Sequence, residues 1–376
     1  MTMASCLTDV PHPGEFIRDE LDARGWTQRD LAYILGVAEQ AVNVIISGKR
    51  GVSPEMAKAL GEAFDVSAEY FANLQQMYEM SNAREPDPGV ARRAALQNIY
   101  PVREMIKRGW LADTEIDLLE LQMMRFFGKN NLGDIPYLAH AAKKSGDYNE
   151  TSHSELAWLF RCKQMASEMI AVPFSEQKLR SFVADMPRFM VDPEEIRHVP
   201  KALAECGIRY VVVETLPKAN IDGVCFWLDD SSPVIGMTTR HDRIDNYWFV
   251  LRHEIEHVLN KDGKGELRAE TVDTDLEEGG DDLPPYEIVA NKAAAECCVP
   301  REQLENFYLR KFPFISERDT LAFAKRVQRH PGIVVGQLQR KMNRYDWLAK
   351  YKVKVRQWLV GAANIDGWGA SAPVSL

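Results

Sequence analysis

The chain has 376 residues, which is enough for two or three domains, each with its own core. Hydrophobic residues make up 45% and charged residues 27%, a balance that excludes the disordered and fibrous classes. The net charge of −9 argues against general electrostatic binding to nucleic acid or to anionic lipid. Apolar runs stay well short of the ~20 residues that span a bilayer, and the N-terminal residues lack the pattern of a secretory signal. We therefore expect a cytoplasmic protein without a membrane partner.

Five short helical patterns occupy residues 13–79, each with its own start and stop signals. Thr27 begins the second pattern and is followed three residues later by Asp30, which indicates a capped helix start. The helices at residues 27–35 and 38–45 are joined by a tight turn that contains a glycine. This arrangement is typical of a helix-turn-helix, so we predict a head of this type over residues 1–80.

The second helix of the pair would read the bases of DNA, because glutamine and asparagine side chains pair with adenine edges and glutamate accepts from cytosine. The side chains expected to contact DNA are Thr27, Gln28, Glu39, Gln40, Asn43, Lys49 and Arg50. However, residues 1–80 contain six basic and twelve acidic residues, the reverse of the usual charge of a DNA-binding domain. Binding as a homodimer to two half-sites would compensate, and a head that binds only protein is the alternative.

After the head, residues 81–94 contain two prolines, a glycine and mixed charge, which predicts a linker. Residues 95–200 have mainly helical patterns. Residues 201–360 begin with short β-branched and aromatic runs that predict a small sheet, and helices follow. Within this region, the acidic segment 263–285 has the composition of a solvated loop. Residues 361–376, which follow the region, have the composition of a flexible tail. The fold class predicted is α+β, mainly α, with the sheet packed on a pair of helices.

The stretch YWFVLRHEIEHVLNKDG carries His253 and His257 four residues apart, with Glu254 next to the first. On a helix the two histidines lie on one face, so both imidazoles can bind one zinc ion. Glu254 is placed to take a proton from water at the metal without binding the metal itself. The helix is apolar nearly all round, which indicates burial, and buried histidines need polar partners.

A catalytic zinc needs a third protein ligand and an open fourth position. Glu287, in the helical run YEIVANKAAAE, is the best candidate, and Cys297 and Cys298 are its rivals. We favour the glutamate because hard oxygen ligands suit a hydrolytic site. Asn291, one turn after Glu287, is a candidate to hydrogen-bond a ligand histidine and fix its tautomer.

Peptide hydrolysis also needs a donor for the carbonyl oxygen on which negative charge develops. The candidates for this role are His330, which we select as a tentative catalytic residue, and Tyr286, Arg240 and Tyr247. An extended substrate could pair with an exposed strand, and residues 233–239 are the candidate edge because they lie closest in sequence to the histidine helix.

Both halves of the chain resemble known families. Residues 13–79, with the ending YFANLQQMYE, resemble the XRE-type helix-turn-helix of HigA-like antitoxins. Residues 95–355 resemble the ImmA/IrrE-type metallopeptidases through DNYWFVLRHEIEHVL, EIVANKAAAECCVP and HPGIVVGQLQ. The second resemblance implies that His253, His257 and Glu287 bind zinc and that Glu254 is catalytic. The cysteines in AECCVP replace aliphatic residues usual in that family, which would leave Cys297 or Cys298 near the metal.

The resemblances imply two functions in one chain. ImmA/IrrE-type peptidases cleave helix-turn-helix repressors, and HigA-like antitoxins bind a basic ribonuclease toxin and repress their own operon. The leading hypothesis is a transcriptional regulator or antitoxin that binds operator DNA and is fused to a zinc endopeptidase, which cuts a protein partner, a repressor or the chain itself. The alternative is a non-enzymatic antitoxin or transcription factor that neutralises a basic toxin, with the zinc domain as sensor or scaffold. A zinc hydrolase of small molecules is the third possibility.

Overall fold

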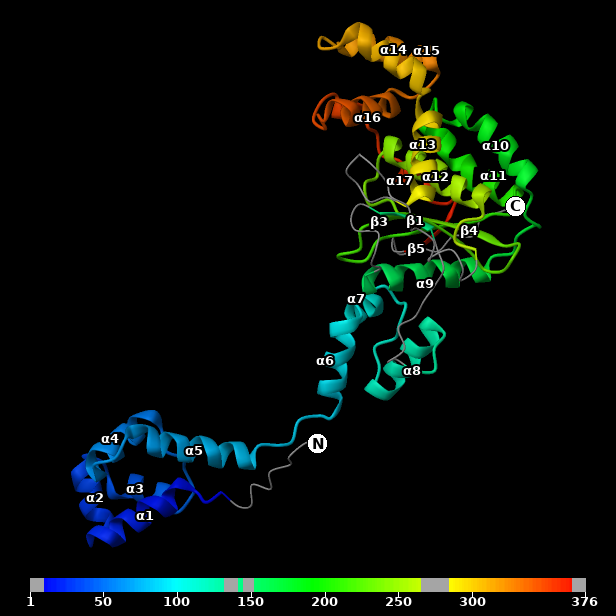
Figure 1. Ribbon diagram of the computed structural model, residues 1–376. Coiled ribbons are helices and arrows are strands. Elements are labelled where there is room, and N and C mark those ends of the chain that lie inside the picture. Colours follow the sequence, from blue (N-terminus) through cyan, green and yellow to red (C-terminus); the bar gives the residue numbers. More distant parts are fainter. Residues whose placement is uncertain (1–9, 132–140, 145–151, 265–283, 367–376) are drawn as a thin grey trace. The chain divides into compact units, whose positions relative to one another are not determined.

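The computed structural model describes the backbone of residues 10–131, 141–144, 152–264 and 284–366. The chain divides into two compact units, residues 1–88 and residues 89–376 (Figure 1). Among the described residues, no helix is both long enough and apolar enough to cross a bilayer. The segment 265–283, which contains most of the predicted acidic loop, lies outside the described residues.

The first unit is the five-helix head that the sequence predicted. Its helices are α1 (Pro13–Arg24), α2 (Gln28–Leu35), α3 (Glu39–Ile46), α4 (Pro54–Phe64) and α5 (Ala68–Asn82). Thr27 and Asp30 form the predicted capping box at the start of α2. Helices α1 and α3 pack closely, because a Cβ atom on Gly14 would lie 2.3 Å from the carbonyl oxygen of Ile45. Only glycine fits that contact without moving one of the helices.

The segment between the two units is shorter than the predicted linker, residues 81–94. Helix α5 continues to Asn82, and α6 (Gly89–Ile99) already begins inside that range. Only residues 83–88 separate the two helices. Proline and glycine also occur at the starts of helices, so their presence in this stretch led to a predicted linker that is too long.

The second unit is built on a five-stranded mixed sheet with the order β1-β3-β4-β2-β5. The strands are β1 (Ala141–Lys144), β2 (Arg209–Val213), β3 (Ile221–Trp227), β4 (Pro233–Met237) and β5 (Asn364–Asp366). Strand β3 runs antiparallel to β1 and β4, whereas β2 runs parallel to β4 and β5.

This topology corrects three predictions. Residues 233–237 form β4 in the middle of the sheet, so they are not the exposed edge. Residues 141–144 add a strand to a region predicted as helical, and residues 364–366 add a strand inside the predicted tail. The first segment, AAKK, does not alternate apolar and polar residues, and the second, NID, is too short for its alternation to predict a strand. Their pairing with β3 and β2 was therefore not visible in the sequence.

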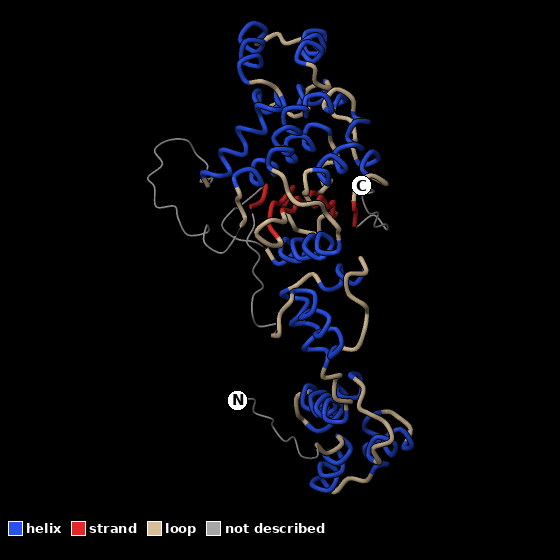
Figure 2. Tube along the Cα trace, turned by 90° about the vertical axis from the view of Figure 1, so that its right-hand side faces the viewer, coloured by secondary structure: helices blue, strands red, loops and turns tan. Residues whose placement is uncertain are grey.

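The two faces of the sheet face different helical layers, as Figure 2 shows. Val211 and Val213 of β2 join the core formed with α9 (His153–Glu168), while Tyr210 and Val212 join the opposite core. The first layer also contains α6, α7 (Val102–Lys107) and α8 (Ile116–Phe127). The strict alternation follows from the two-residue period of a strand.

The opposite layer holds the histidine helix. Its α-helices are α10 (Glu176–Phe189), α11 (Val199–Glu205), α12 (Ile244–Asn260), α13 (Pro285–Cys298), α14 (Arg301–Lys311), α15 (Glu317–Val327), α16 (Pro331–Met342) and α17 (Arg356–Leu359). Two 3₁₀ helices complete the layer: η1 (Pro193–His198) precedes α11, and η3 (Ala349–Tyr351) lies between α16 and α17. Helix α12 packs against β3, α13 and α16. The predicted fold class, α+β and mainly α with a small sheet packed on a helix pair, is confirmed.

Candidate metal centre and DNA-reading helix

Helix α12 brings the two histidines of the motif together inside the protein. His253 and His257 are fully buried and lie one turn apart on the same face. Their Nε2 atoms point toward each other at 2.9 Å. The other sides of the helix are also buried in the core, where Trp248, Leu251 and Ile255 pack. This burial explains why the helix is apolar on nearly every side.

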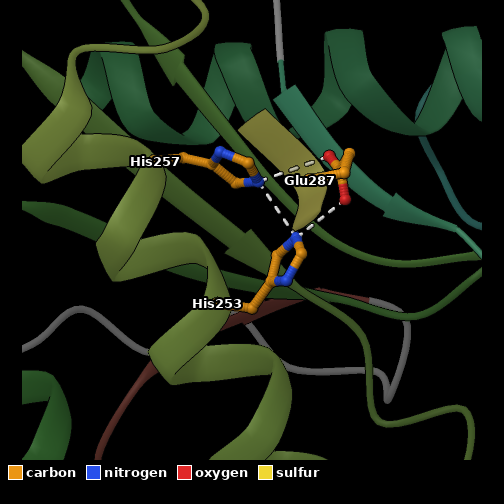
Figure 3. A group of neighbouring side chains, drawn as sticks. All are labelled: His253, His257 and Glu287. Carbon is orange, nitrogen blue, oxygen red and sulfur yellow. Dashed lines mark hydrogen bonds and ion pairs between the residues drawn. The ribbon is translucent and has the colours of Figure 1, made fainter. Parts of the chain in front are cut away.

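Helix α13 adds a carboxylate to this pair. Glu287 stands in its first turn, is fully buried, and places Oε2 3.1 Å from Nε2 of His253 and Oε1 3.3 Å from Nε2 of His257 (Figure 3). The three side chains offer metal-ligating atoms that lie within 4.8 Å of one another. The predicted set is therefore brought together from two helices, and Glu287 follows His257 by thirty residues in the sequence.

The spacing of these atoms fits a zinc ion. Bonds of ~2.0–2.1 Å in tetrahedral geometry separate neighbouring ligand atoms by roughly 3.3 Å. The separations found here, 2.9, 3.1 and 3.3 Å, are close to that value. Two imidazoles and one carboxylate are also the protein ligands of known catalytic zinc sites. His253, His257 and Glu287 thus form a candidate metal centre.

The electrostatics of the three side chains favour a positive charge between them. Burial works to lower the pKa of His257, but hydrogen bonds with Asp262 and Glu287 outweigh it and raise this pKa to about 10. Burial works to raise the pKa of Glu287, but hydrogen bonds from His253 and His257 lower it to about 2. A divalent cation would take the place of the imidazolium proton, so metal binding would release protons.

Glu254 lies against the backbone of the sheet. It is fully buried, and a Cβ atom on Gly223 of β3 would lie 2.7 Å from its Oε1 and 2.6 Å from Val250 Cγ1. A larger residue at position 223 would therefore displace the glutamate that stands beside the candidate metal ligands. The glycine keeps the strand close to the turn of α12 that carries Glu254.

Asp262 is a site residue that the sequence reasoning missed. Its Oδ2 is 3.0 Å from Nδ1 of His257, the ring nitrogen that faces away from the donor cluster. Its backbone N–H donates to the carbonyl of His257, and its own carbonyl accepts from Nε1 of Trp227 at 3.0 Å. Lys261, in the left-handed conformation, ends α12 and turns the chain back toward the histidine. In the sequence, an acidic residue directly after the end of the histidine helix was the signal that could have identified it.

Replacing Asp262 by alanine should weaken zinc binding by about 10- to 100-fold, because a carboxylate on the second ring nitrogen orients a ligand histidine and raises its basicity. Competition with a chromophoric chelator measures this affinity. Asp230→Ala is the matched control, since the side chain of Asp230 is 98% exposed. Equal zinc affinity of the Asp262 variant and the wild type would contradict this role.

The two cysteines do not join the cluster. The group of metal-ligating side chains among the described residues contains neither Cys297 nor Cys298. Both stand at the far end of α13, about 15 Å along the helix axis from Glu287. Burial raises the pKa of both thiols. The expectation that a cysteine lies near the metal is therefore wrong.

The candidates for the carbonyl-oxygen donor lie in different places. The ring of Tyr286 on α13 contacts the ring of His257, with centroids 5.9 Å apart. Arg240 forms an ion pair with Asp222 at 3.0 Å, and the hydroxyl of Tyr247 lies 3.5 Å from that of Tyr210 in the core. Tyr286 is thus the candidate that contacts the metal centre.

His330, the tentative catalytic residue, caps α16. Its Nδ1 accepts a hydrogen bond of 3.1 Å from the N–H of Gly332. Gly332 in turn packs against Ile244, the first residue of α12, about 13 Å along the axis from His253. This position argues against a catalytic role. Asn291, the predicted partner of a ligand histidine, lies one turn beyond Glu287 on α13.

In the head, α3 presents the side chains predicted to read DNA. Glu39, Gln40 and Asn43 are exposed on it, and Lys49 and Arg50 are exposed just beyond its end. The amide of Asn43 donates to Gln28 Oε1 at 3.2 Å, which links α3 to the start of α2.

Thr27, the remaining predicted contact, and Glu39 also have partners within the head. Thr27 is exposed and caps α2. Glu39 forms an exposed ion pair with Arg29 at 3.3 Å. The structure brings all seven predicted residues to the same helix pair.

Comparison with known proteins identifies both domains. Residues 17–71 match the model of the helix-turn-helix family, and residues 205–341 match that of the IrrE N-terminal-like domain. The chain belongs to the XRE-type helix-turn-helix proteins, and its second unit is similar to the IrrE N-terminal-like domain. Virulence-associated protein A' of Dichelobacter nodosus is 41% identical over 80 residues, which are 21% of this chain and 70% of the relative.

Two further proteins are similar to the helix-turn-helix domain. The uncharacterized HTH-type transcriptional regulator YddM of Escherichia coli K12 is 28% identical over 79 residues, 21% of this chain and 84% of the relative. A solved structure described as Pseudomonas aeruginosa antitoxin HigA with higBA promoter is 35% identical, covers 24% of this chain and 89% of its own, and has a TM-score of 0.19. The two family models confirm the helix-turn-helix and IrrE-type resemblances drawn from the sequence, and the IrrE-type match includes His253, His257 and Glu287.

Proposed function

We propose that this protein is a DNA-binding regulator whose IrrE-type domain is a zinc-dependent endopeptidase acting on a protein partner. The observation that carries the proposal is the buried cluster of His253, His257 and Glu287, with Glu254 one residue after the first histidine and packed on β3. This cluster stands in the same chain as a helix-turn-helix head. A regulator that carries a peptidase could link proteolysis to gene expression.

In this proposal His253, His257 and Glu287 would hold zinc, which when bound polarises the scissile carbonyl and acidifies a water molecule. Glu254 would accept the proton of the attacking water and deliver it to the leaving amine. Tyr286, next to His257 and 38% exposed, would donate to the carbonyl oxygen as it becomes negative. Asp262 would keep the ring of His257 in position.

The sheet offers a place for an extended substrate, although not on the strand expected from the sequence. Among the described strands, β1 is one of the two at the edges of the sheet; it pairs with β3 and lies against α12. A peptide that added to the outer edge of β1, with which no described strand pairs, would run beside the helix that carries the two histidines. We therefore assign substrate pairing to β1 in place of β4.

The head would bind operator DNA through α3, with a homodimer bound to two half-sites. Gln40→Ala should weaken binding to the DNA upstream of the chain's own gene by about 10- to 100-fold, or ~1–3 kcal/mol, because a bidentate base contact is lost. Lys49→Ala should weaken binding to all sequences alike and reduce the salt slope by about one. Fluorescence anisotropy with labelled DNA at several salt concentrations measures both effects.

The control for the DNA-binding test is Gln76→Ala, which removes an exposed glutamine from α5 and leaves α3 intact. We expect its DNA affinity to equal that of the wild type. Unchanged affinity in the Gln40 and Lys49 variants would show that α3 does not face DNA.

A second candidate function rests on the acidic charge of the head. Residues 1–80 contain six basic and twelve acidic residues, which suits a basic protein partner such as a ribonuclease toxin. In that case the IrrE-type domain would act as a zinc sensor or scaffold. Co-purification of a small basic protein with the chain, lost at high salt, would support this function.

A further inference from the structure

A cavity of about 750 Å³ lies between α13, α14 and α16, and all of its lining residues are described. Its apolar lining includes Ile288, Val299 and Leu304. This volume is within the range of small-ligand sites and exceeds the space that one side chain fills. The cavity is therefore large enough for a short stretch of peptide.

The charged lining of this cavity is mainly basic. It consists of Lys292, Arg301, Arg340 and Lys341, against Glu296 and Glu305. Lys341 is neutralised by Glu305 at 2.7 Å. Among the described residues, no carboxylate forms an ion pair with Lys292 or Arg340. This surplus of positive charge occurs in a chain whose net charge is −9, and it favours an anionic occupant.

The cavity adjoins the candidate metal centre through stacked side chains. The guanidinium of Arg340 lies over the ring of Phe249, 5.7 Å from its centroid, and the same ring stacks on His253 with centroids 6.5 Å apart. On the other side, Asn291 lines the cavity one turn beyond Glu287. Only the ring of Phe249 separates Arg340 from His253, and only one helical turn separates Asn291 from Glu287.

We propose that this cavity is a specificity subsite that takes an acidic segment of the substrate beside the scissile bond. The proposal rests on the peptidase function proposed above. Arg340 and Lys292 would bind the carboxylates through charge-assisted hydrogen bonds, and Ile288 and Leu304 would contact the aliphatic parts of the segment. The preferred cleavage sites would then have glutamate or aspartate close to the bond that is cut.

Binding to full-length, zinc-loaded Glu254→Gln tests the subsite without cleavage of the probe. The probes are two labelled, capped pentapeptides, Ala-Glu-Leu-Glu-Ala and its counterpart with glutamine at both glutamate positions, titrated by fluorescence anisotropy. The acidic peptide should bind at least about tenfold more tightly, which corresponds to ~1.4 kcal/mol. In the Arg340→Gln, Lys292→Gln background this preference should disappear while the zinc content stays unchanged.

Arg344→Gln is the matched control, because Arg344 follows the end of α16, pairs with Asp346 at 3.8 Å and does not line the cavity. This control should keep the preference for the acidic peptide. Equal binding of the two peptides, or a preference that survives in the double variant, would overturn the subsite. Peptidase activity is measured separately, as substrate cleavage by protein that retains Glu254. Failure of the subsite proposal can therefore be distinguished from failure of the peptidase proposal.

Discussion

Replacing Glu254 by glutamine should reduce peptide cleavage by about 10²–10⁴-fold and leave the zinc content unchanged. Glutamine has nearly the same shape as glutamate and keeps the contact with Gly223, but it cannot accept the proton of the attacking water. Glu254 is not one of the three side chains whose ligating atoms converge, so the metal should stay bound. Cleavage is measured by mass spectrometry with helix-turn-helix repressors, basic toxins and the chain itself as substrates.

Glu256→Gln is the control for this experiment. Glu256 lies two residues further along the same helix and forms an ion pair with Arg252 at 2.7 Å, away from the donor cluster. Its replacement by glutamine keeps a hydrogen-bond acceptor and should preserve cleavage. Equal rates for Glu254→Gln and the wild type, on a substrate that the wild type cuts, would remove Glu254 from the mechanism.

Replacing Glu287 by alanine should weaken zinc binding by more than about 100-fold. This loss is larger than the one expected for a residue such as Asp262, which only hydrogen-bonds a ligand histidine. The substitution removes one of three protein ligands and leaves two facing imidazoles, 2.9 Å apart, without a negative charge between them. Wild-type protein at a zinc concentration of 100 times Kd should gain ~2.7 kcal/mol of stability, because only the folded state holds the site. The variant should lose this gain.

Thermal unfolding with and without zinc measures the effect at Glu287. Glu302→Ala provides the comparison, since Glu302 is exposed in the first turn of α14. This control should be stabilised by zinc as strongly as the wild type. A zinc-dependent rise in Tm that persists in Glu287→Ala would mean that the metal binds elsewhere.

The sequence predicted the features that are set by local patterns. The capping box of Thr27 and Asp30 and the start of α4 at Pro54 follow from short-range chemistry, so the five helices of the head were predictable. The spacing of His253 and His257 predicted their common face for the same reason. Glu287 was found by its residue type and its helical context, and the fold then placed it on the two histidines.

The features that the sequence did not predict depend on contacts between distant segments. Strands β1 and β5 have four and three residues, and each exists because it pairs with a strand more than seventy residues away. The central position of β4 depends on its parallel pairing with β2. The contact of Asp262 with His257 depends on the left-handed turn at Lys261, which a lysine only rarely adopts.

The most direct test of the account is the X-ray absorption spectrum of the purified, zinc-loaded full-length protein at the zinc edge. The account predicts one zinc per chain, bound only by nitrogen and oxygen at ~2.0–2.1 Å, with the imidazole scattering of two histidines. This shell should be lost in Glu287→Ala. Sulfur at ~2.3 Å would place a cysteine on the metal and contradict the assignment of His253, His257 and Glu287, as would the absence of stoichiometric zinc.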